Sequence, residues 1–324
     1  MKNFSRFGHL LILMFLLIFF ACEEDNKLEK EISEIPVDFQ IERFDEAFSK
    51  ASINELPKLR EQYPFILVDR IPDSLYIMEQ QDSLQLVLFK EVAKKYPNLT
   101  EVEHDIKRLF QHLKYYDKTF SIPRVITATS SVDYRNKTIV TDSIVLIALD
   151  TYLGSEHEFY GNIPMYTTQN METEQIVSDL AGDYAEKYTY QSQKKTFLDE
   201  MIFFGKQLYF KDKVIPFETE AIRMGYNGEQ LGWAMANEYQ IWTYFIENEL
   251  LYSTDSSLPS RFIAPAPFSK FYLELDNEAP GRLGQYIGWQ IVKSYMNNND
   301  TPFLKMMELE ADEIFKNSKY KPNK

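Results

Sequence analysis

Cysteine is almost missing from this chain, which has a single one, Cys22, among 324 residues. One thiol cannot form an intramolecular disulfide, so the folded body must be stabilised by its core alone. The position of Cys22, at the end of an apolar run near the N-terminus, indicates a role in targeting and excludes a thiol-based active site in the body of the chain.

Histidine is scarce too, and none of the four histidines is placed to share a zinc ion. His104 and His112 are eight residues apart on an expected helix. That spacing corresponds to about 12 Å, whereas zinc–ligand bonds are about 2 Å long. His157 and Glu158 begin an H-E-x-x-H motif, but Gly161 stands at its second histidine. With no G-x-S-x-G elbow, Walker loop or dinucleotide fingerprint either, the sequence predicts no cofactor, no metal and no catalytic residues, and therefore not an enzyme.

Basic side chains are outnumbered, with 35 lysines and arginines against 49 acidic residues and a net charge of −14. This balance excludes nucleic acid as a partner, and it excludes binding to a membrane through anionic headgroups. Glycine is also rare, at 11 residues, while 15% of the chain is aromatic. The composition therefore favours a globular body of long helices with aromatic packing.

The N-terminus has the arrangement of regions that is typical of an export signal. Lys2 and Arg6 precede an unbroken apolar run, Leu10 to Phe20, which is shorter than the about 20 residues that a membrane-spanning helix needs. Ala21 and Cys22 end the run. The arrangement resembles the lipobox of bacterial lipoproteins, although aromatic residues occupy positions 19 and 20. The resemblance implies cleavage before Cys22 and its acylation, with palmitate among the chains; an uncleaved anchor is the alternative.

We therefore divide the chain into a signal peptide over 1–21, an acidic tether over 22–35 and one globular domain over 36–324. The expected location is the cell envelope, with the protein held by lipid in the outer membrane on its periplasmic face. The acidic residues directly after Cys22 also resemble a surface-export signal, so exposure on the cell surface is left open.

Hydrophobic periodicity predicts a mostly helical body. Alternation over 37–41 indicates a first strand, and two segments rich in Val, Ile and Thr, 124–129 and 138–149, indicate an antiparallel hairpin. Helices are expected over 54–62, 82–96, 99–113, 172–188, 195–210, 228–251, 281–296 and 302–317. Because no linker divides this body, the predicted fold class is α+β, a predominantly helical single domain with a small antiparallel sheet.

One carboxylate, Glu238, stands in the apolar stripe of the expected helix 228–251. An unpaired buried carboxylate is costly, so Glu238 should find a cation or another donor. It and its neighbours form either an internal ion pair that braces the fold or a binding cleft. The candidate set consists of Glu238, Trp242, Arg223, Arg261, Arg282 and Gln290.

Three glycines interrupt expected helices. Gly284 and Gly288 lie one turn apart within 281–296, and Gly205 lies within 195–210. Each glycine costs a helix interior about 1 kcal/mol relative to alanine. We therefore expect another helix, or a ligand, to approach this bare ridge closely.

Five segments together make the chain resemble the gliding-motility lipoprotein family called GldB. They are LIALDTYLG from Leu146, MIFFGKQLYF from Met201, NEYQIWTYFIE from Asn237, LLYSTD from Leu250 and PGRLGQYIGWQIV from Pro280. The resemblance runs from the signal peptide almost to Lys324. It implies an envelope lipoprotein needed for gliding, functionally tied to type IX secretion, with no known catalytic residue.

That family is in turn similar to gluzincin-like metallopeptidases, which carry H-E-x-x-H on one helix and a glutamate before a glycine on a following helix. Here the corresponding helix reads SDLAGDYA from Ser178, without histidine, and Phe204 precedes Gly205. The resemblance implies a degenerate gluzincin-like fold, a pseudoenzyme that binds envelope proteins of the gliding and secretion apparatus. An envelope hydrolase, or a protein that binds a ligand in the remnant cleft, is the alternative.

Three Asp-Ser-aliphatic triplets resemble O-glycosylation acceptors of envelope proteins in gliding bacteria. Their serines are Ser74, Ser83 and Ser143. Ordinary turn or capping serines explain these triplets equally well.

Overall fold

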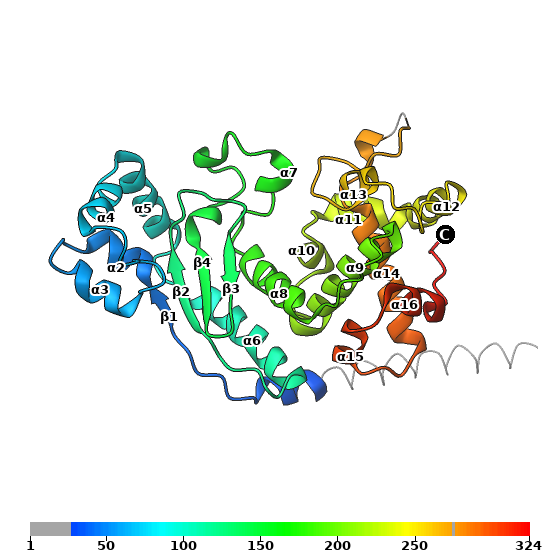
Figure 1. Ribbon diagram of the computed structural model, residues 1–324, viewed down its shortest axis with the longest axis horizontal. Helices are drawn as coiled ribbons and strands as arrows, with labels where there is room; N and C mark the ends of the chain where they lie inside the picture. The colour runs from blue at the N-terminus through cyan, green and yellow to red at the C-terminus, as the bar shows by residue number, and fades with distance from the viewer. Residues whose placement is uncertain (1–26, 274–275) are drawn as a thin grey trace, which may run out of the picture.

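A four-stranded mixed sheet lies between two groups of helices (Figure 1). The computed structural model describes residues 27–273 and 276–324. Within these ranges the strand order is β1-β2-β4-β3. The bounds are β1 Ile41–Arg43, β2 Arg124–Ala128, β3 Thr138–Val140 and β4 Ile144–Ala148. β1 and β4 both pair with β2 in parallel, whereas β3 pairs with β4 in antiparallel orientation and forms one edge.

The predicted hairpin between 124–129 and 138–149 is wrong. The second segment divides into β3 and β4 at a tight turn, where the Thr141 N–H donates to the Ile144 carbonyl at 2.8 Å, and these two strands form the hairpin. β2 instead pairs in parallel with β4, with Val125 opposite Val145. The first strand also begins later than predicted, because only its last residue, Ile41, belongs to β1.

Side chains of the two central strands alternate between two cores, as the pleat of a strand requires. Val125 and Val145 face a large core that continues into the C-terminal helices. Ile126 and Leu146 face a smaller core beneath α2, α3, α4 and α5. The bounds of these four helices are Phe44–Lys50, Leu56–Gln62, Asp73–Gln80 and Ser83–Lys95. The sheet is therefore covered on both faces, which suits its short apolar strands.

Helices make up most of the rest of the described chain, and the predicted α+β class with a predominantly helical body is confirmed. They are α6 Thr100–Tyr116, α7 Met165–Thr168, α8 Gln175–Tyr188, α9 Phe197–Val214, α10 Glu220–Met224, α11 Gly228–Ala236, α12 Glu238–Glu247, α13 Ser257–Phe262, α14 Leu283–Asn298, α15 Phe303–Met307 and α16 Ala311–Ser318. Short 3-10 turns occur at Leu149–Thr151, Glu158–Tyr160 and Asp276–Glu278. The predicted helix 228–251 divides at Asn237 into α11 and α12, and the predicted helix 302–317 divides into α15 and α16.

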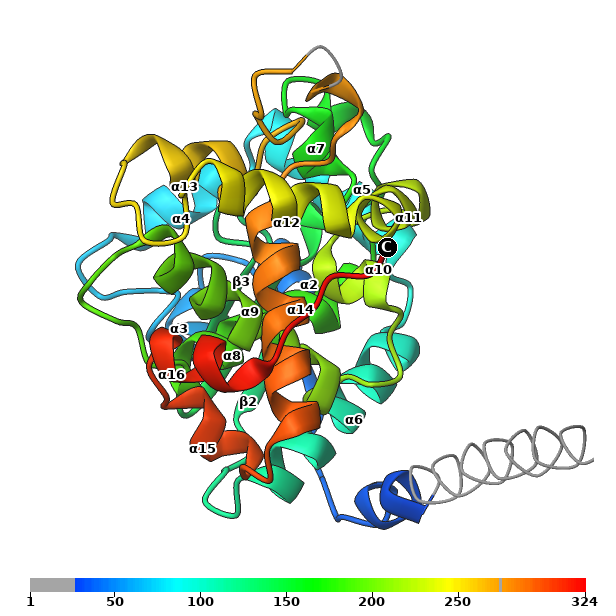
Figure 2. The same cartoon turned by 90° about the vertical axis from the view of Figure 1, so that its right-hand side faces the viewer.

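Helices α9 and α14 pack against each other in the C-terminal half (Figure 2), and their backbones meet at glycines. A methyl group added to Gly288 would overlap the backbone carbonyl of Met201, and one added to Gly205 would overlap the backbone of Gly288. The expected close approach of a second helix to the glycine ridge is confirmed.

The described part of the expected tether contacts the folded body. Residues 27–33 are helical, and Ile32 is only 1% exposed. Gln111 of α6 donates to the carbonyls of Ser33 and Ile35 at 2.7 and 3.1 Å. Segment 27–35 is therefore packed against α6.

Candidate functional site

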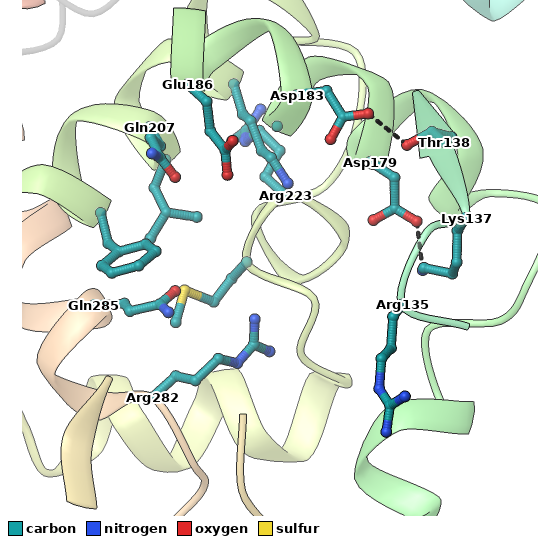
Figure 3. Close-up of a pocket in the computed structure, with 15 residues that line it drawn as sticks. Arg135, Lys137, Thr138, Asp179, Asp183, Glu186, Gln207, Arg223, Arg282 and Gln285 are labelled. Atoms are coloured by element: carbon teal, nitrogen blue, oxygen red, sulfur yellow. Dashed lines mark hydrogen bonds and ion pairs between the residues drawn. The ribbon is translucent and has the colours of Figure 1, made fainter. Parts of the chain in front are cut away.

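Two adjoining cavities form one cleft between the β3 side of the sheet and the C-terminal helices. Their volumes are about 270 and 520 Å³, and both are lined by Arg135, Lys137, Asp179 and Arg282. Figure 3 shows Arg135 and Arg282 on opposite sides of the smaller cavity, with Asp179 and Asp183 together on one helix. The cleft therefore combines cationic and anionic side chains from segments far apart in the sequence.

Helix α8 supplies two carboxylates one turn apart. Asp179 accepts a hydrogen bond from the Tyr152 hydroxyl at 2.7 Å and forms an ion pair with Lys137. Asp183 accepts from the Thr138 hydroxyl at 2.7 Å, and burial raises its pKa to about 6. The spacing of four residues places both on one helix face. They join α8 to β3 and to the segment before it.

Lys211 of α9 lies behind these carboxylates. Its Nζ donates to the Ser178 Oγ at 3.1 Å, and that hydroxyl donates to the Ile222 carbonyl at 3.0 Å. No carboxylate lies within ion-pairing distance of Lys211 among the described residues. Burial consequently lowers the pKa of Lys211 to about 8.

Arg282 forms the opposite wall, directly before α14. Its backbone is left-handed, with φ of 62°. Its guanidinium lies over the Tyr226 ring, 5.1 Å from the centroid, and donates to the Gly225 carbonyl at 2.6 Å. Gly225 is also left-handed, with φ of 66°, and a side chain there would crowd the guanidinium. This irregular backbone holds Arg282 at the cavity.

The loop between β2 and β3 carries Arg135 and Lys137 into the cleft and is fixed by Asp150. The Asp150 side chain is completely buried and accepts the N–H groups of Ser130 at 2.9 Å and Val132 at 2.6 Å. Val132 has φ of 61°, a strained conformation for a β-branched residue. Such strain persists only where the surroundings impose it, and it concentrates at functional sites.

The structure places Glu238 away from this cleft. Glu238 is 2% exposed at the start of α12. It accepts from the hydroxyls of Tyr286 at 3.1 Å and Tyr320 at 2.8 Å, and from the Asn323 backbone at 3.2 Å. Its donors are therefore two tyrosines and the C-terminal tail, and it has no ion pair within the ranges that the structure describes. Glu238 fastens the tail to α12 and α14.

Of the other predicted site residues, two arginines lie at the cleft, whereas Trp242, Arg261 and Gln290 lie outside it. Arg223 and Arg282 line the smaller cavity, and Arg223 pairs with Asp212 at 2.9 Å. Trp242 packs against the Tyr320 ring, at 5.2 Å between centroids. Arg261 donates to the Lys270 carbonyl at 2.9 Å, and Gln290 lies on α14. The predicted set therefore does not form one site, and only the two arginines reach the cleft.

Sequence reasoning missed Arg135, Lys137, Asp179, Asp183 and Lys211 as site residues. In the sequence, nothing distinguishes Asp179 and Asp183 from the other acidic residues, of which the chain has 49 in total. The one usable signal was Lys211, because it continues the apolar face of α9 that also carries Leu208 and Val214.

Among the described residues no group of three histidine, cysteine or acidic side chains could hold a metal ion. The described helices also include none that is both long and apolar enough to cross a membrane, while Cys22 lies outside the described ranges.

Comparison with known proteins gives one match. The family described as "Gliding motility protein GldB" matches residues 25–322. Neither a curated protein nor a solved structure matches the chain significantly, so the resemblance to gluzincins stays a prediction. The family match spans nearly the whole chain, including every residue of the cleft. The chain therefore belongs to the GldB family of gliding motility proteins.

Proposed function

We propose that the protein is a lipid-anchored component of the gliding apparatus in the cell envelope, linked to type IX secretion, and that it acts by binding another protein. The family match over residues 25–322 is the observation that carries this proposal. The apolar run ending at Cys22 supports a lipid anchor, since that run is too short to span a bilayer.

The cleft supports binding as the mode of action. Its adjoining cavities offer hydrogen-bond donors and acceptors together with aromatic walls from Tyr134, Tyr166 and Tyr226. Mixed polar and aromatic linings are typical of surfaces that bind protein segments. The left-handed backbone at Arg282 and the Asp150-bound loop hold these groups in place, which reduces the entropy lost on binding.

A hydrolase is the second candidate, because Ser178 and Lys211 have the composition of a nucleophile and its base. However, Ser178 has no exposed surface, and its hydroxyl already donates to Ile222. A substrate carbonyl could not approach this oxygen without opening α8 from α10. This burial favours binding over hydrolysis.

Replacing Cys22 by serine is expected to release the protein from the membrane fraction and to stop gliding in a host that glides. The reason is the loss of the acyl chains, which contribute about 0.8 kcal/mol per buried CH₂ group. Fractionation with immunoblotting, together with colony spreading, measures both effects. Asn26→Ser is the control in the same segment. A Cys22→Ser protein that stays in the membrane and supports gliding would contradict the anchor.

A photocrosslinking residue at Tyr166, which lines the larger cavity, tests the role of the cleft. In the native host, p-benzoylphenylalanine at this position is expected to crosslink an envelope protein of the gliding or type IX secretion apparatus. Tyr252 is the control position, because it is 57% exposed and lies outside both cavities. Crosslinks to such proteins from position 252 but not from 166 would refute a binding cleft.

A further inference from the structure

The cleft contains an unusual group of cations for so acidic a chain. Most other arginines with partners are neutralised: Arg43, Arg60, Arg124 and Arg223 pair with carboxylates. Arg135, Lys211 and Arg282 all line the smaller cavity, and none of them has a carboxylate within 4 Å in the described part of the chain. Three positive groups thus face one cavity without a counter-charge in contact.

Each of these three cations retains unused donors. A guanidinium has five N–H donors and an ammonium has three. Arg282 uses one donor on the Gly225 carbonyl, and Lys211 uses one on Ser178. Arg135 is exposed on its loop and lies over the Tyr134 ring, 5.4 Å from the centroid.

Another lysine of α9, Lys206, is only 2% exposed and has a purely structural role. Its Nζ donates to three backbone carbonyls, those of Tyr190, Met307 and Leu309. Lys211 has only the Ser178 hydroxyl in the described structure, although burial disfavours its charge as well. Gln207 also lines this cavity. An acceptor supplied from outside would give the Lys211 ammonium the second hydrogen bond that the described structure does not provide.

We propose that the cleft binds an acidic peptide segment, whose carboxylate is held by Arg135, Lys211 and Arg282. The inference rests on the proposed function, since it specifies the chemistry of the bound segment. The carboxylate can come from an aspartate or glutamate side chain or from a free C-terminus, because all three present the same acceptor oxygens.

The charges around the cavity favour a single carboxylate over a polyanion. Five cations line the smaller cavity, but Asp179, Asp183 and Glu186 line it too. These acids offset most of the positive potential and would repel a phosphate dianion. They are at the same time acceptors for the N–H groups of a peptide backbone. The tyrosines of the larger cavity can contact the flanking residues.

The test uses the full-length protein in detergent and capped tripeptides as probes. Isothermal titration compares tyrosine–aspartate–tyrosine with tyrosine–asparagine–tyrosine, both acetylated and amidated. A third probe, the asparagine peptide with a free C-terminus, distinguishes the two sources of the carboxylate. At least one carboxylate probe is expected to bind about tenfold or more tighter than the neutral peptide. Equal affinities, or displacement by phosphate at lower concentration than by acetate, would overturn the proposal.

Variants assign the effect to the three cations. Arg135→Gln, Arg282→Gln and Lys211→Met should each weaken carboxylate binding about tenfold. Arg135 is exposed, so its variant is expected to stay folded even if Arg282→Gln does not. Arg261→Gln is the matched control, because Arg261 also lacks a carboxylate partner in the described structure but lies outside both cavities. Unchanged binding by Arg135→Gln would overturn the assignment.

Thermal unfolding provides a readout that a structural lysine would not give. Lys211→Met should raise the melting temperature, by about 5 °C, because it removes a desolvated charge that has no carboxylate within ion-pairing distance in the described structure. Lys206→Met should lower it, because three carbonyls lose their donor. A lower melting temperature for Lys211→Met would assign Lys211 to the fold and contradict its part in the site.

The carboxylate proposal and the binding role can fail separately. If position 166 crosslinks an apparatus protein but the aspartate and asparagine probes bind alike, only the carboxylate proposal fails. If the aspartate probe binds more tightly but no apparatus protein is crosslinked, the proposed partner class fails.

Discussion

Replacing Gly288 by alanine is expected to lower the free energy of unfolding by about 3 kcal/mol or more. The added methyl group would overlap the Met201 carbonyl, which belongs to the backbone of α9 and cannot rotate away. Either α9 and α14 must separate or one of them must bend, and both changes open the core around Trp289. In circular dichroism the melting temperature of the full-length protein should fall by about 6–12 °C, at about 2–4 °C per kcal/mol for a chain of this size.

Gly232→Ala is the matched control for this experiment. Gly232 lies within α11, and a methyl group added there meets no atom within 4 Å. The substitution should leave stability unchanged or raise it by up to about 1 kcal/mol, because alanine favours the helix. If Gly288→Ala has the same melting temperature as the unchanged protein while Gly232→Ala behaves as expected, α9 and α14 do not approach each other as closely as described.

The Gly288 case shows where sequence reasoning was strong. A glycine in the middle of an apolar helix is costly, so two such glycines one turn apart predict a close neighbour without any knowledge of the partner. The long helices were also predictable, because their apolar stripes repeat at 3.6 residues. Asp82 even ends up as the cap of α5, accepting the Leu84 N–H at 2.9 Å.

Sheet pairing was not predictable in the same way. A short apolar strand buried on both faces has no alternation that reveals its partner, and β2 has four buried residues in a row. Two such segments on either side of a turn predict a hairpin, because neighbouring segments are the simplest pairing. The turn at 141–143, which separates β3 from β4, was hidden inside one segment rich in Val and Ile.

The candidate site was only partly predictable for a related reason. Glu238 stood out because it interrupts an apolar stripe, but that pattern reports burial and does not report what buries it. Its partners, Tyr320 and Asn323, come from the far end of the chain. The cleft likewise joins residues from 135 to 282, so no local pattern could have shown that their charges converge.

Asp150 is the residue on which one wall of the cleft depends, and Asp150→Asn is expected to cost about 2–4 kcal/mol of unfolding free energy. The buried carboxylate accepts the Ser130 N–H on both oxygens and the Val132 N–H on Oδ2. In the asparagine variant one of these positions becomes an amide nitrogen that faces a donor, and the remaining neutral oxygen accepts the backbone N–H groups more weakly than a carboxylate does. The hydrogen bonds that hold the left-handed backbone of Val132 are therefore weakened. Hydrogen exchange should show lost protection at residues 130 and 132, and carboxylate binding should fall with it because Arg135 is on this loop.

Asp133→Asn separates this effect from a general change in loop charge. Asp133 is on the same loop, but its carboxylate accepts from Asn136 and Arg135 at the surface. Its substitution makes the same chemical change without burying an unpaired group, so we expect little change in melting temperature or in exchange at residue 132. If both variants behave alike, charge and not buried geometry controls the loop. If only Asp150→Asn loses protection at 132, the strain at Val132 is held by Asp150, and the position of Arg135 depends on a residue that does not line the cleft.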